Sequence, residues 1–364
     1  MPTDFYAVIM AGGGGTRLWP ISRQERPKQS LRLFGDKTPF QWAVDRLLPM
    51  MPIERILVAT VGWQVGQLRE QAPMLGEGNF LEEPAPRGTA SVAGLAALAV
   101  RRKDPEAVMA LLTADHFIGN PEKFREILLA SHEVAQSGDM VTLGISPTFP
   151  AERYGYIHMG EAIGNFGGFE AWRVAAFVEK PSPEKAQRYL DSGEYLWNSG
   201  MFIWKAERLL EEIERLMPDL HDALSKIDNM LDDPSQSDKL TRIYKGLQSE
   251  TIDYGIMERA ERVAVVPAPD LGWFDIGGWD GLFTLVGPNE ENNVVLAPKT
   301  LIKDTTGTLV FQEEKATRLI ATLGVEDLII VDAGDVLLVC PREKAERVRS
   351  LVESLRQAGM EQYL

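Results

Sequence analysis

The sequence has little cysteine, little histidine and no long apolar run, and each shortage excludes a class of protein. Its 364 residues include one cysteine, Cys340, so an intrachain disulfide is impossible and a cysteine-based metal site is not expected. The four histidines show no metal-ligand spacing, and we expect His132 and His221 to lie on helix surfaces. No stretch approaches the roughly 18 apolar residues of a membrane span, and the N-terminus lacks the basic region of a signal peptide. These absences predict a cytoplasmic enzyme.

Positive charge is also scarce. The chain has 38 Lys and Arg residues against 53 Asp and Glu residues, a net charge of −15. Such a balance disfavours nucleic acid and anionic membrane as partners. Residues 17–32 are the exception, because five Lys or Arg residues stand there against one acid, Glu25. This local excess of cations indicates a site for an anionic ligand.

The same region begins with an apolar run of strand length, Tyr6–Ala11, followed by four glycines at 12–15. Glycines allow consecutive backbone N–H groups to face a phosphate, and a helix beginning soon afterwards would add its positive end. The alternative is a tight turn followed by a solvated basic helix. Neither the dinucleotide spacing G-x-G-x-x-G nor the P-loop spacing fits, because Arg17 and Leu18 occupy the positions that these patterns require. The stretch therefore predicts a short phosphate-binding glycine nest that ends at Arg17.

Strand-like and helix-like segments alternate up to about residue 285, which predicts an α/β fold with a largely parallel sheet. Ligands of such sheets bind at the carboxyl ends of the strands, so Gly12, Asp115 and Lys180 are predicted to converge on one cleft. Expected strands are Tyr6–Ala11, Arg55–Thr60, Ala107–Thr113, Asp139–Ile145, Val174–Glu179, Gly200–Trp204 and Val263–Val266. Expected helices are Pro39–Leu48, Gly62–Ala72, Thr89–Arg102, Pro121–Ser137, Pro183–Ser192 and Ala206–Met217.

Residues 218–260 resemble a mostly helical insert, and residues 287–293 are the best candidate for a linker. After the linker, short apolar strands separated by turns predict a small β-rich domain. A helical stripe at Arg342–Ala358 closes the chain and indicates packing or a subunit contact. We therefore expect a catalytic domain at 1–286 and a β-rich domain with a final helix at 290–364.

Two carboxylates are candidates for chemistry. Asp115 follows a buried strand, where a carboxylate can bind Mg²⁺, although it can equally cap a turn. Asp275 stands among glycines and tryptophans in 272–279, and a tight turn with buried aromatics is the alternative. Polar residues that suit sugar hydroxyls or a phosphate are Glu179, Lys180, Asn198 and Asp253, each of which also has an ordinary structural explanation at a turn or helix end.

Taken as a set, these motifs resemble the sugar-1-phosphate nucleotidyltransferases over essentially residues 6–340. The signature is AGGGGTRLWPISR followed by PKQ at 27–29, and its Leu18-Trp19-Pro20 form is similar to the mannose-1-phosphate guanylyltransferase branch. The resemblance implies a Rossmann-like, mixed but mostly parallel sheet in a GT-A-like catalytic domain. It also implies a short left-handed β-helix in the C-terminal domain. No phosphomannose isomerase-like segment follows residue 364, so a second activity is not expected.

The implied reaction makes GDP-mannose and pyrophosphate from GTP and α-D-mannose 1-phosphate by Mg²⁺-assisted, in-line displacement in a homodimer. The resemblance assigns catalysis to Arg17 and Lys28, and Mg²⁺ binding to Asp115 and Asp275. It assigns nucleotide binding to Ala11, Gly12, Gly13, Gly14, Thr16, Arg87, Gly88, Thr89 and Asp115. It assigns sugar-phosphate binding to Gly155, Glu179, Lys180, Asn198 and Asp253.

Alternatives remain open at this point. Relatives carry R-N-T-A where this chain has Arg87-Gly88-Thr89-Ala90, so a pyrophosphorylase for another nucleotide and hexose is one alternative. A non-catalytic subunit that binds nucleotide-sugar is another, but it should have lost a metal or phosphate group, and this chain keeps them. A glycosyltransferase is disfavoured because Ala114 and His116 flank Asp115 where a D-x-D motif would stand.

Overall fold

The computed structural model describes residues 2–231 and 233–364, and the chain divides into two compact units. Unit 1 holds the chain up to Gly12 together with Ala43–Ala114 and Ile118–Trp273, and unit 2 holds Gly13–Trp42, Asp115–Phe117 and Phe274–Leu364. Across the described part of the chain, no helix has the length and apolar character needed to cross a membrane.

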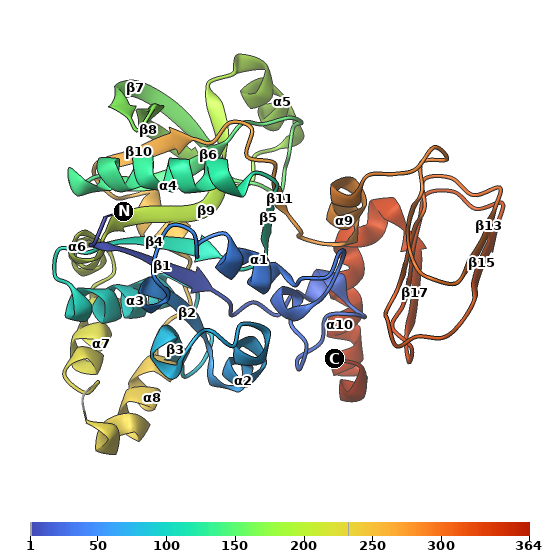
Figure 1. Cartoon of the computed structure of the whole chain (residues 1–364), viewed down its shortest axis with the longest axis horizontal. Coiled ribbons are helices and arrows are strands. Elements are labelled where there is room, and N and C mark those ends of the chain that lie inside the picture. Colours follow the sequence, from blue (N-terminus) through green and yellow to red (C-terminus); the bar gives the residue numbers. More distant parts are fainter. Residues whose placement is uncertain (1, 232) are drawn as a thin grey trace. The chain divides into compact units, whose positions relative to one another are not determined.

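Unit 1 contains a nine-stranded sheet in the order β3-β2-β1-β4-β9-β6-β10-β8-β7 (Figure 1). Strands β1, β2, β3 and β4 are parallel, as are β6 and β10, while β9 runs antiparallel between β4 and β6. The mixed, mostly parallel sheet predicted from the sequence is confirmed. The strands are β1 (Phe5–Met10), β2 (Ile56–Val61), β3 (Phe80–Glu83), β4 (Val108–Thr113), β6 (Met140–Ile145), β7 (Tyr156–Phe166), β8 (Phe169–Val178), β9 (Tyr195–Lys205) and β10 (Val263–Pro267).

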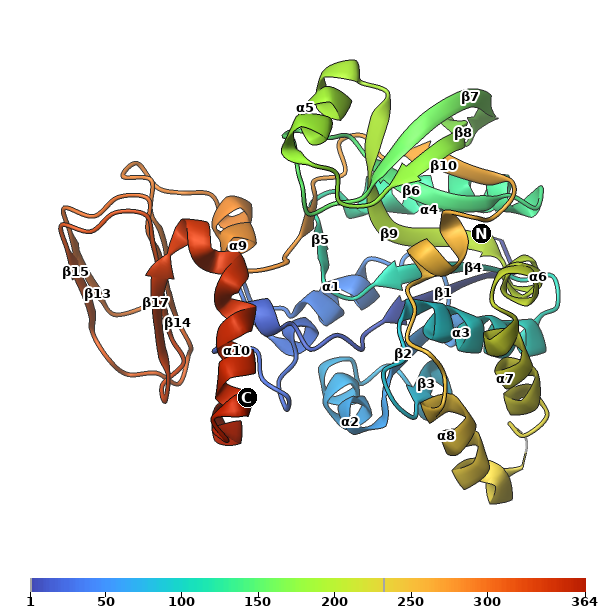
Figure 2. The ribbon, with the colours of Figure 1, turned by 180° about the vertical axis from the view of Figure 1, so that it is seen from behind.

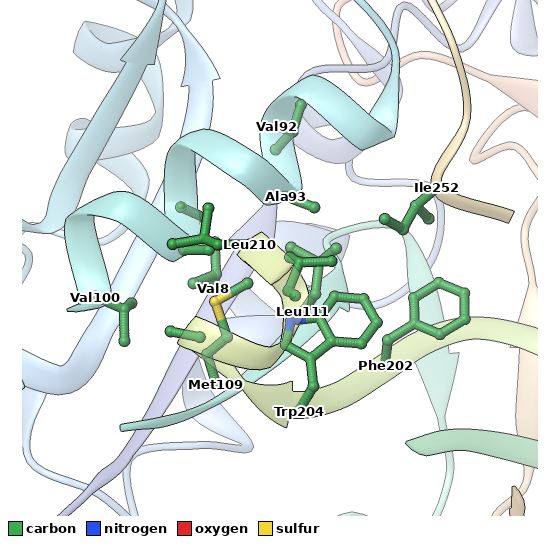
Figure 3. Close-up of a cluster of buried hydrophobic side chains, with 14 of the residues drawn as sticks. Val8, Val92, Ala93, Val100, Met109, Leu111, Phe202, Trp204, Leu210 and Ile252 are labelled. Carbon is green, nitrogen blue, oxygen red and sulfur yellow. The ribbon is translucent and has the colours of Figure 1, made fainter. Parts of the chain in front are cut away.

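Helices cover both faces of this sheet (Figures 1 and 2). Because successive side chains of a strand point to opposite faces, Val8 of β1 packs with α3 while Phe5 contacts His132 of α4 on the other side. The small residues of α3 bring it close to the sheet, and Figure 3 shows Val92 and Ala93 in the same cluster as Trp204 of β9. The helices of unit 1 include α2 (Gly62–Gln71), α3 (Thr89–Lys103), α4 (Pro121–Gln136), α5 (Pro183–Ser192), α6 (Ala206–Leu216), α7 (Pro218–Asp228) and α8 (Ser237–Lys245).

All strands and helices expected up to Val266 are present within a few residues, and two strands of the large sheet were missed. β3 is only four residues long, and β7 carries glycines and exposed polar residues that hide its alternation. The helical insert is confirmed by α7, α8 and a π-helical turn at Asp253–Met257, although Asp232 lies outside the described residues. The surface position expected of His132 is wrong, because its ring is buried against Phe5 and its Nε2 lies 3.2 Å from Asp4 Oδ1.

Unit 2 contains a small parallel β-coil. Strands β12, β14 and β16 stack in parallel with β17 antiparallel at the end, and β13 pairs in parallel with β15. The register places Val294, Leu309 and Ile329 in one buried column. Each short strand thus adds an apolar side chain to a continuous core. These strands are β12 (Val294–Leu296), β13 (Thr300–Lys303), β14 (Leu309–Gln312), β15 (Ile320–Leu323), β16 (Leu328–Asp332) and β17 (Leu337–Pro341).

The signature loop at 13–42 packs inside unit 2. Leu18, Trp19 and Ile21 share a buried cluster with Trp279 of α9 (Trp279–Val286) and Val348 of α10 (Val348–Gln357). The glycines lead into a 3-10 turn, Thr16–Leu18. The α-helix that could have followed them and added its positive end therefore does not form. A second 3-10 turn follows at Lys28–Ser30, and the remaining elements near it are α1 (Pro39–Asp45), β5 (His116–Ile118) and β11 (Trp273–Asp275). The domain division at 286–290 stays a prediction.

Candidate active site

Lys28 is the centre of the site in unit 2. Its Nζ donates to Asp115 Oδ2 at 2.9 Å and to Asp275 Oδ1 at 3.3 Å, while its side chain is only 7% exposed. Asp115 directly precedes β5, and Asp275 is the last residue of β11. Residues 28, 115 and 275, far apart in the sequence, therefore meet at one buried ammonium group.

The charges in this cluster stabilise one another. Burial by itself would lower the pKa of Lys28, but the two carboxylates outweigh it and raise that pKa above its usual value. Burial likewise opposes ionisation of Asp115, but Lys28 and then His116 hold the pKa of that carboxyl well below its usual range. The cluster is thus an ammonium held between two carboxylates, with Lys28 and Asp115 each favouring the charged form of the other.

Gly15 explains how Lys28 reaches this position. Its backbone is in the left-handed region, with φ of 62°, and a Cβ there would lie 2.3 Å from Lys28 Cβ. Ser22 Oγ donates to the carbonyl of Gly15 at 2.6 Å and fixes the loop. By contrast, a Cβ on Gly13 or Gly14 would meet no atom within 4 Å, so these two glycines leave open space. The close packing of Gly15 against Lys28 thus allows no side chain at position 15, whereas positions 13 and 14 are unobstructed.

Arg17 lies beside the same cluster. Its Nη1 donates to Glu346 Oε2 at 3.2 Å, and both side chains are partly exposed. A Cβ on Gly277 would lie 3.3 Å from Arg17 Nη2 and 3.2 Å from Asp275 Oδ2, so the glycines of the 272–279 motif make room for the guanidinium. One contact to Glu346 engages few of the five N–H donors of an arginine, which leaves Arg17 able to bind a phosphate.

The other arginines of the signature are engaged in ion pairs. Arg23 pairs with Asp335, Arg26 with Glu313, and Arg32 with Glu314 at 3.8 Å. The cation excess that indicated an anion site is therefore largely neutralised by carboxylates of the β-coil. Of the predicted cationic residues, Lys28 and Arg17 remain as candidates.

A divalent metal fits Asp115 and Asp275. Both carboxylates already converge on one cationic atom, Lys28 Nζ, so they can share a cation. In the described residues, no group of three or more His, Cys, Asp or Glu side chains is arranged to hold a metal. A set of two carboxylates suits a hard cation that takes its remaining ligands from water and substrate phosphates.

Unit 1 brings four of the predicted sugar-phosphate residues together. Asn198 donates from Nδ2 to Asp253 Oδ1 at 2.7 Å, and its backbone N–H donates to the carbonyl of Gly155 at 2.8 Å. Burial raises the pKa of Glu179, the Asp253 carboxylate raises it further, and the Asn198 amide lowers it. Burial also raises the pKa of Asp253. The amide of Asn198 thus bridges two carboxyl groups whose remaining oxygens can accept from hydroxyls.

The place of Lys180 in the site is less defined than that of these four residues. It is exposed, and its φ of 52° places a non-glycine residue in the left-handed region. Backbone strain of this kind costs on the order of 1 kcal/mol or more and often marks a functional position. Its predicted contact with the sugar phosphate, like its convergence with Gly12 and Asp115, stays a prediction.

We expect Gly155→Ala to damage the sugar-phosphate group selectively. The new Cβ would lie 2.0 Å from Glu179 Oε1, so the carboxylate must move away from Asn198. The KM for the sugar phosphate should rise by about tenfold, because a misplaced charged hydrogen bond is worth about 1.5–3 kcal/mol. Steady-state kinetics measures this, with Gly66→Ala as the control, since a Cβ there meets no atom within 4 Å. An unchanged KM would remove Glu179 from substrate binding.

The Arg87-Gly88-Thr89 segment is held by contacts with the helical insert at 218–260. Gly88 has φ of 82°, and a Cβ there would lie 2.1 Å from the carbonyl oxygen of Glu250. Any side chain, including the asparagine of relatives, would have to displace this backbone. Arg87 donates from Nε to the carbonyl of Lys245 at 2.9 Å, and Thr89 Oγ1 accepts from the N–H of Ile252 at 2.9 Å. The close approach of the insert therefore favours glycine at position 88.

Glu83 is a buried carboxylate that was not among the residues predicted from the sequence. This carboxylate ends β3 and is buried, with Oε2 accepting from Tyr244 Oη at 2.8 Å and Oε1 3.5 Å from the position of a Cβ on Gly12. Burial raises the pKa of Glu83, and the hydrogen bond from Tyr244 lowers it. Ala11, just before Gly12, is fixed by β2, since its N–H donates to Ala59 and its carbonyl accepts from Thr60. The available signal was a carboxylate at the end of a strand, the same signal that singled out Asp115.

Comparisons with known proteins identify the family of this chain. The nucleotidyl transferase family matches residues 6–290, and a MannoseP isomerase/GMP-like beta-helix domain matches residues 300–355. Mannose-1-phosphate guanylyltransferases from Klebsiella pneumoniae and Escherichia coli K12 are each 37% identical over 98% and 99% of this chain. The chain spans 75% of the length of both relatives. A crystal structure described as mannose-1-phosphate geranyltransferase from Thermus thermophilus is 38% identical, with a TM-score of 0.86 over 97% of this chain and 100% of that one. The chain belongs to the mannose-1-phosphate guanylyltransferase family of nucleotidyltransferases.

Proposed function

We propose that the protein makes GDP-mannose and pyrophosphate from GTP and α-D-mannose 1-phosphate. The observation that carries this proposal is the buried ammonium of Lys28 between Asp115 and Asp275, beside the open glycines of the signature loop. Two polyanions have to meet in this reaction, so it requires a fixed ammonium together with carboxylates that can hold a divalent cation.

In the proposed reaction, a phosphate oxygen of the sugar phosphate attacks the α-phosphorus of GTP. The bond from the α-phosphorus to the oxygen that bridges the α- and β-phosphates breaks, and pyrophosphate leaves with the electron pair. The nucleophile is already an anion, so no general base is needed. Arg17 and the nest at Gly12, Gly13, Gly14 and Thr16 bind the triphosphate, and Lys28 neutralises the charge that develops toward pyrophosphate. Asn198, Glu179 and Asp253 bind the sugar hydroxyls, and Lys180 binds the sugar phosphate.

Mg²⁺ is the proposed metal, held by Asp115 and Asp275, where it would neutralise phosphate charge. The homodimer and the cytoplasmic location stay predictions, and light scattering of the purified chain tests the former.

Glu83 supports guanine as the base. An ionised carboxylate only accepts hydrogen bonds, and guanine offers two donors side by side, N1–H and the N2 amino group, where adenine offers an acceptor at N1. Since Tyr244 occupies Oε2, Oε1 is the oxygen that lies next to Gly12, where the nucleotide is proposed to bind. Gly88 has no side chain to contact the base, which leaves its backbone and neighbouring side chains such as Glu83 for that contact.

We expect Glu83→Gln to weaken the preference for GTP over ATP by about 10- to 100-fold, the value of one charged hydrogen bond. In the wild type, the KM for GTP should also rise as the pH falls toward the raised pKa of Glu83, because the protonated carboxyl accepts fewer hydrogen bonds. The glutamine variant should lose this pH dependence. Glu82→Gln, at the exposed neighbouring position, is the control. An unchanged GTP preference in Glu83→Gln would exclude Glu83 from base selection.

A panel assay tests the function as a whole. Pyrophosphate release is measured with GTP, ATP, UTP and CTP against mannose, glucose and fucose 1-phosphates. Release with GTP and mannose 1-phosphate supports the proposal. Release only with another pair would favour a related pyrophosphorylase, and no release with any pair would favour a binding protein.

A further inference from the structure

The turn that precedes Lys28 has an arginine at each end. The backbone N–H of Arg23 donates to the carbonyl of Arg26, and the N–H of Arg26 donates back to Arg23, both at 3.0 Å. Pro27 follows directly and Lys28 comes next, so the orientation of this closed turn sets the direction in which the chain reaches Lys28.

Both arginines of the turn are held by carboxylates of the β-coil. Arg23 donates to the two oxygens of Asp335 at 2.5 and 2.8 Å, and its Nε donates to the carbonyl of Pro20 at 3.0 Å. Arg26 pairs with Glu313, whose side chain is only 15% exposed. A bidentate pair with a carboxylate fixes both the position and the orientation of the arginine side chain.

The segments that carry these two carboxylates are held by backbone hydrogen bonds within the β-coil. The N–H of Glu313 donates to the carbonyl of Asp332 at 2.9 Å, and Asp335 lies in the turn closed by the N–H of Ala333 and the carbonyl of Val336. Asp332 is fully buried and accepts from Arg318 Nη2 at 2.8 Å. Two anchored carboxylates therefore hold both ends of one turn.

We infer that Asp335 and Glu313 are positioning residues for Lys28, acting through Arg23 and Arg26. This inference rests on the proposed function for its effect on catalysis. The two ion pairs keep the turn in the one orientation that delivers the Lys28 ammonium to the site. Each pair has one partly exposed partner, and ion pairs near the surface add little stability individually, so their main effect here is on geometry.

The experiment compares Asp335→Asn, Glu313→Gln and the double variant with the wild type. For the double variant we expect kcat to fall by about tenfold or more, since a displacement of about 1 Å can cost 10²-fold, while the KM for mannose 1-phosphate stays within about twofold. Glu314→Gln is the matched control: it removes the neighbouring carboxylate, whose pair with Arg32 is long and exposed, and should leave kcat unchanged. Asp335→Asn alone covers the case in which a Glu313 variant does not fold, because Asp335 is half exposed.

A second readout does not depend on activity. Hydrogen–deuterium exchange of the amides of residues 26, 30 and 31, which donate within this loop, should become faster in Asp335→Asn and Glu313→Gln but not in Glu314→Gln. The charge-swapped pair Arg26→Glu with Glu313→Arg should recover protection and most of kcat. If the wild type releases no pyrophosphate, the proposed function fails and the exchange data alone decide the inference. Unchanged exchange, unchanged kcat, or a swap that recovers neither would overturn it.

Discussion

Lys28→Met is expected to lower kcat/KM for pyrophosphate release by about 10²- to 10³-fold, which corresponds to roughly 3–4 kcal/mol of transition-state stabilisation. The loss follows from the position of the ammonium, the buried cation between Asp115 and Asp275. Arg32→Met is the matched control, because it removes an exposed cation of the same loop whose nearest carboxylate oxygen is 3.8 Å away. Initial rates with GTP and mannose 1-phosphate measure the effect, and a variant with near-wild-type turnover would remove Lys28 from the mechanism.

Lys28→Met should also change how the free energy of unfolding depends on pH. Lys28 lowers the pKa of Asp115, so in the wild type the stabilisation is present above the unfolded pKa, about 3.9, and is lost only as the pH falls further. Without the ammonium, two carboxylates face each other and the folded pKa of Asp115 rises. The difference in free energy of unfolding between the wild type and Lys28→Met should therefore grow in favour of the wild type as the pH increases from about 3 to 7. Denaturant unfolding across this range measures the difference, and a constant difference would contradict it.

Asp115→Asn and Asp275→Asn are expected to reduce kcat by at least about 10²-fold and to abolish stabilisation by Mg²⁺. The reason is that the described residues offer two carboxylates for a metal at this position, and an amide carries no charge to replace either. In the wild type, added Mg²⁺ should raise the melting temperature at saturating nucleotide, and the chelator EDTA should reverse the rise.

Asp280→Asn is the matched control for these variants, because Asp280 lies near the same motif but its carboxylate is 3.8 Å from Arg342. It should keep both turnover and the response to Mg²⁺. A Mg²⁺-dependent rise in melting temperature that persists in Asp275→Asn would exclude that residue as a metal ligand.

The most informative departures from expectation concern the signature loop. The sequence shows the charge of its arginines but not their partners. Asp335 and Glu313 lie 312 and 287 positions after Arg23 and Arg26, and these pairings depend on how the β-coil packs. Gly88 is a similar case, because its left-handed backbone and its contact with Glu250 come from the insert.

The sequence by itself determined the local elements and the residue types of the site. Apolar runs of strand length and the Ala-rich helix at 89–103 act through short-range preferences, so their structures could be predicted. Tertiary structure decided which charges meet: the ammonium of Lys28 with Asp115 and Asp275, the amide of Asn198 with Asp253, and the buried carboxylate of Glu83 with Tyr244. These pairs join residues between 55 and 247 positions apart, and only the packing of strands and helices brings them within hydrogen-bonding distance.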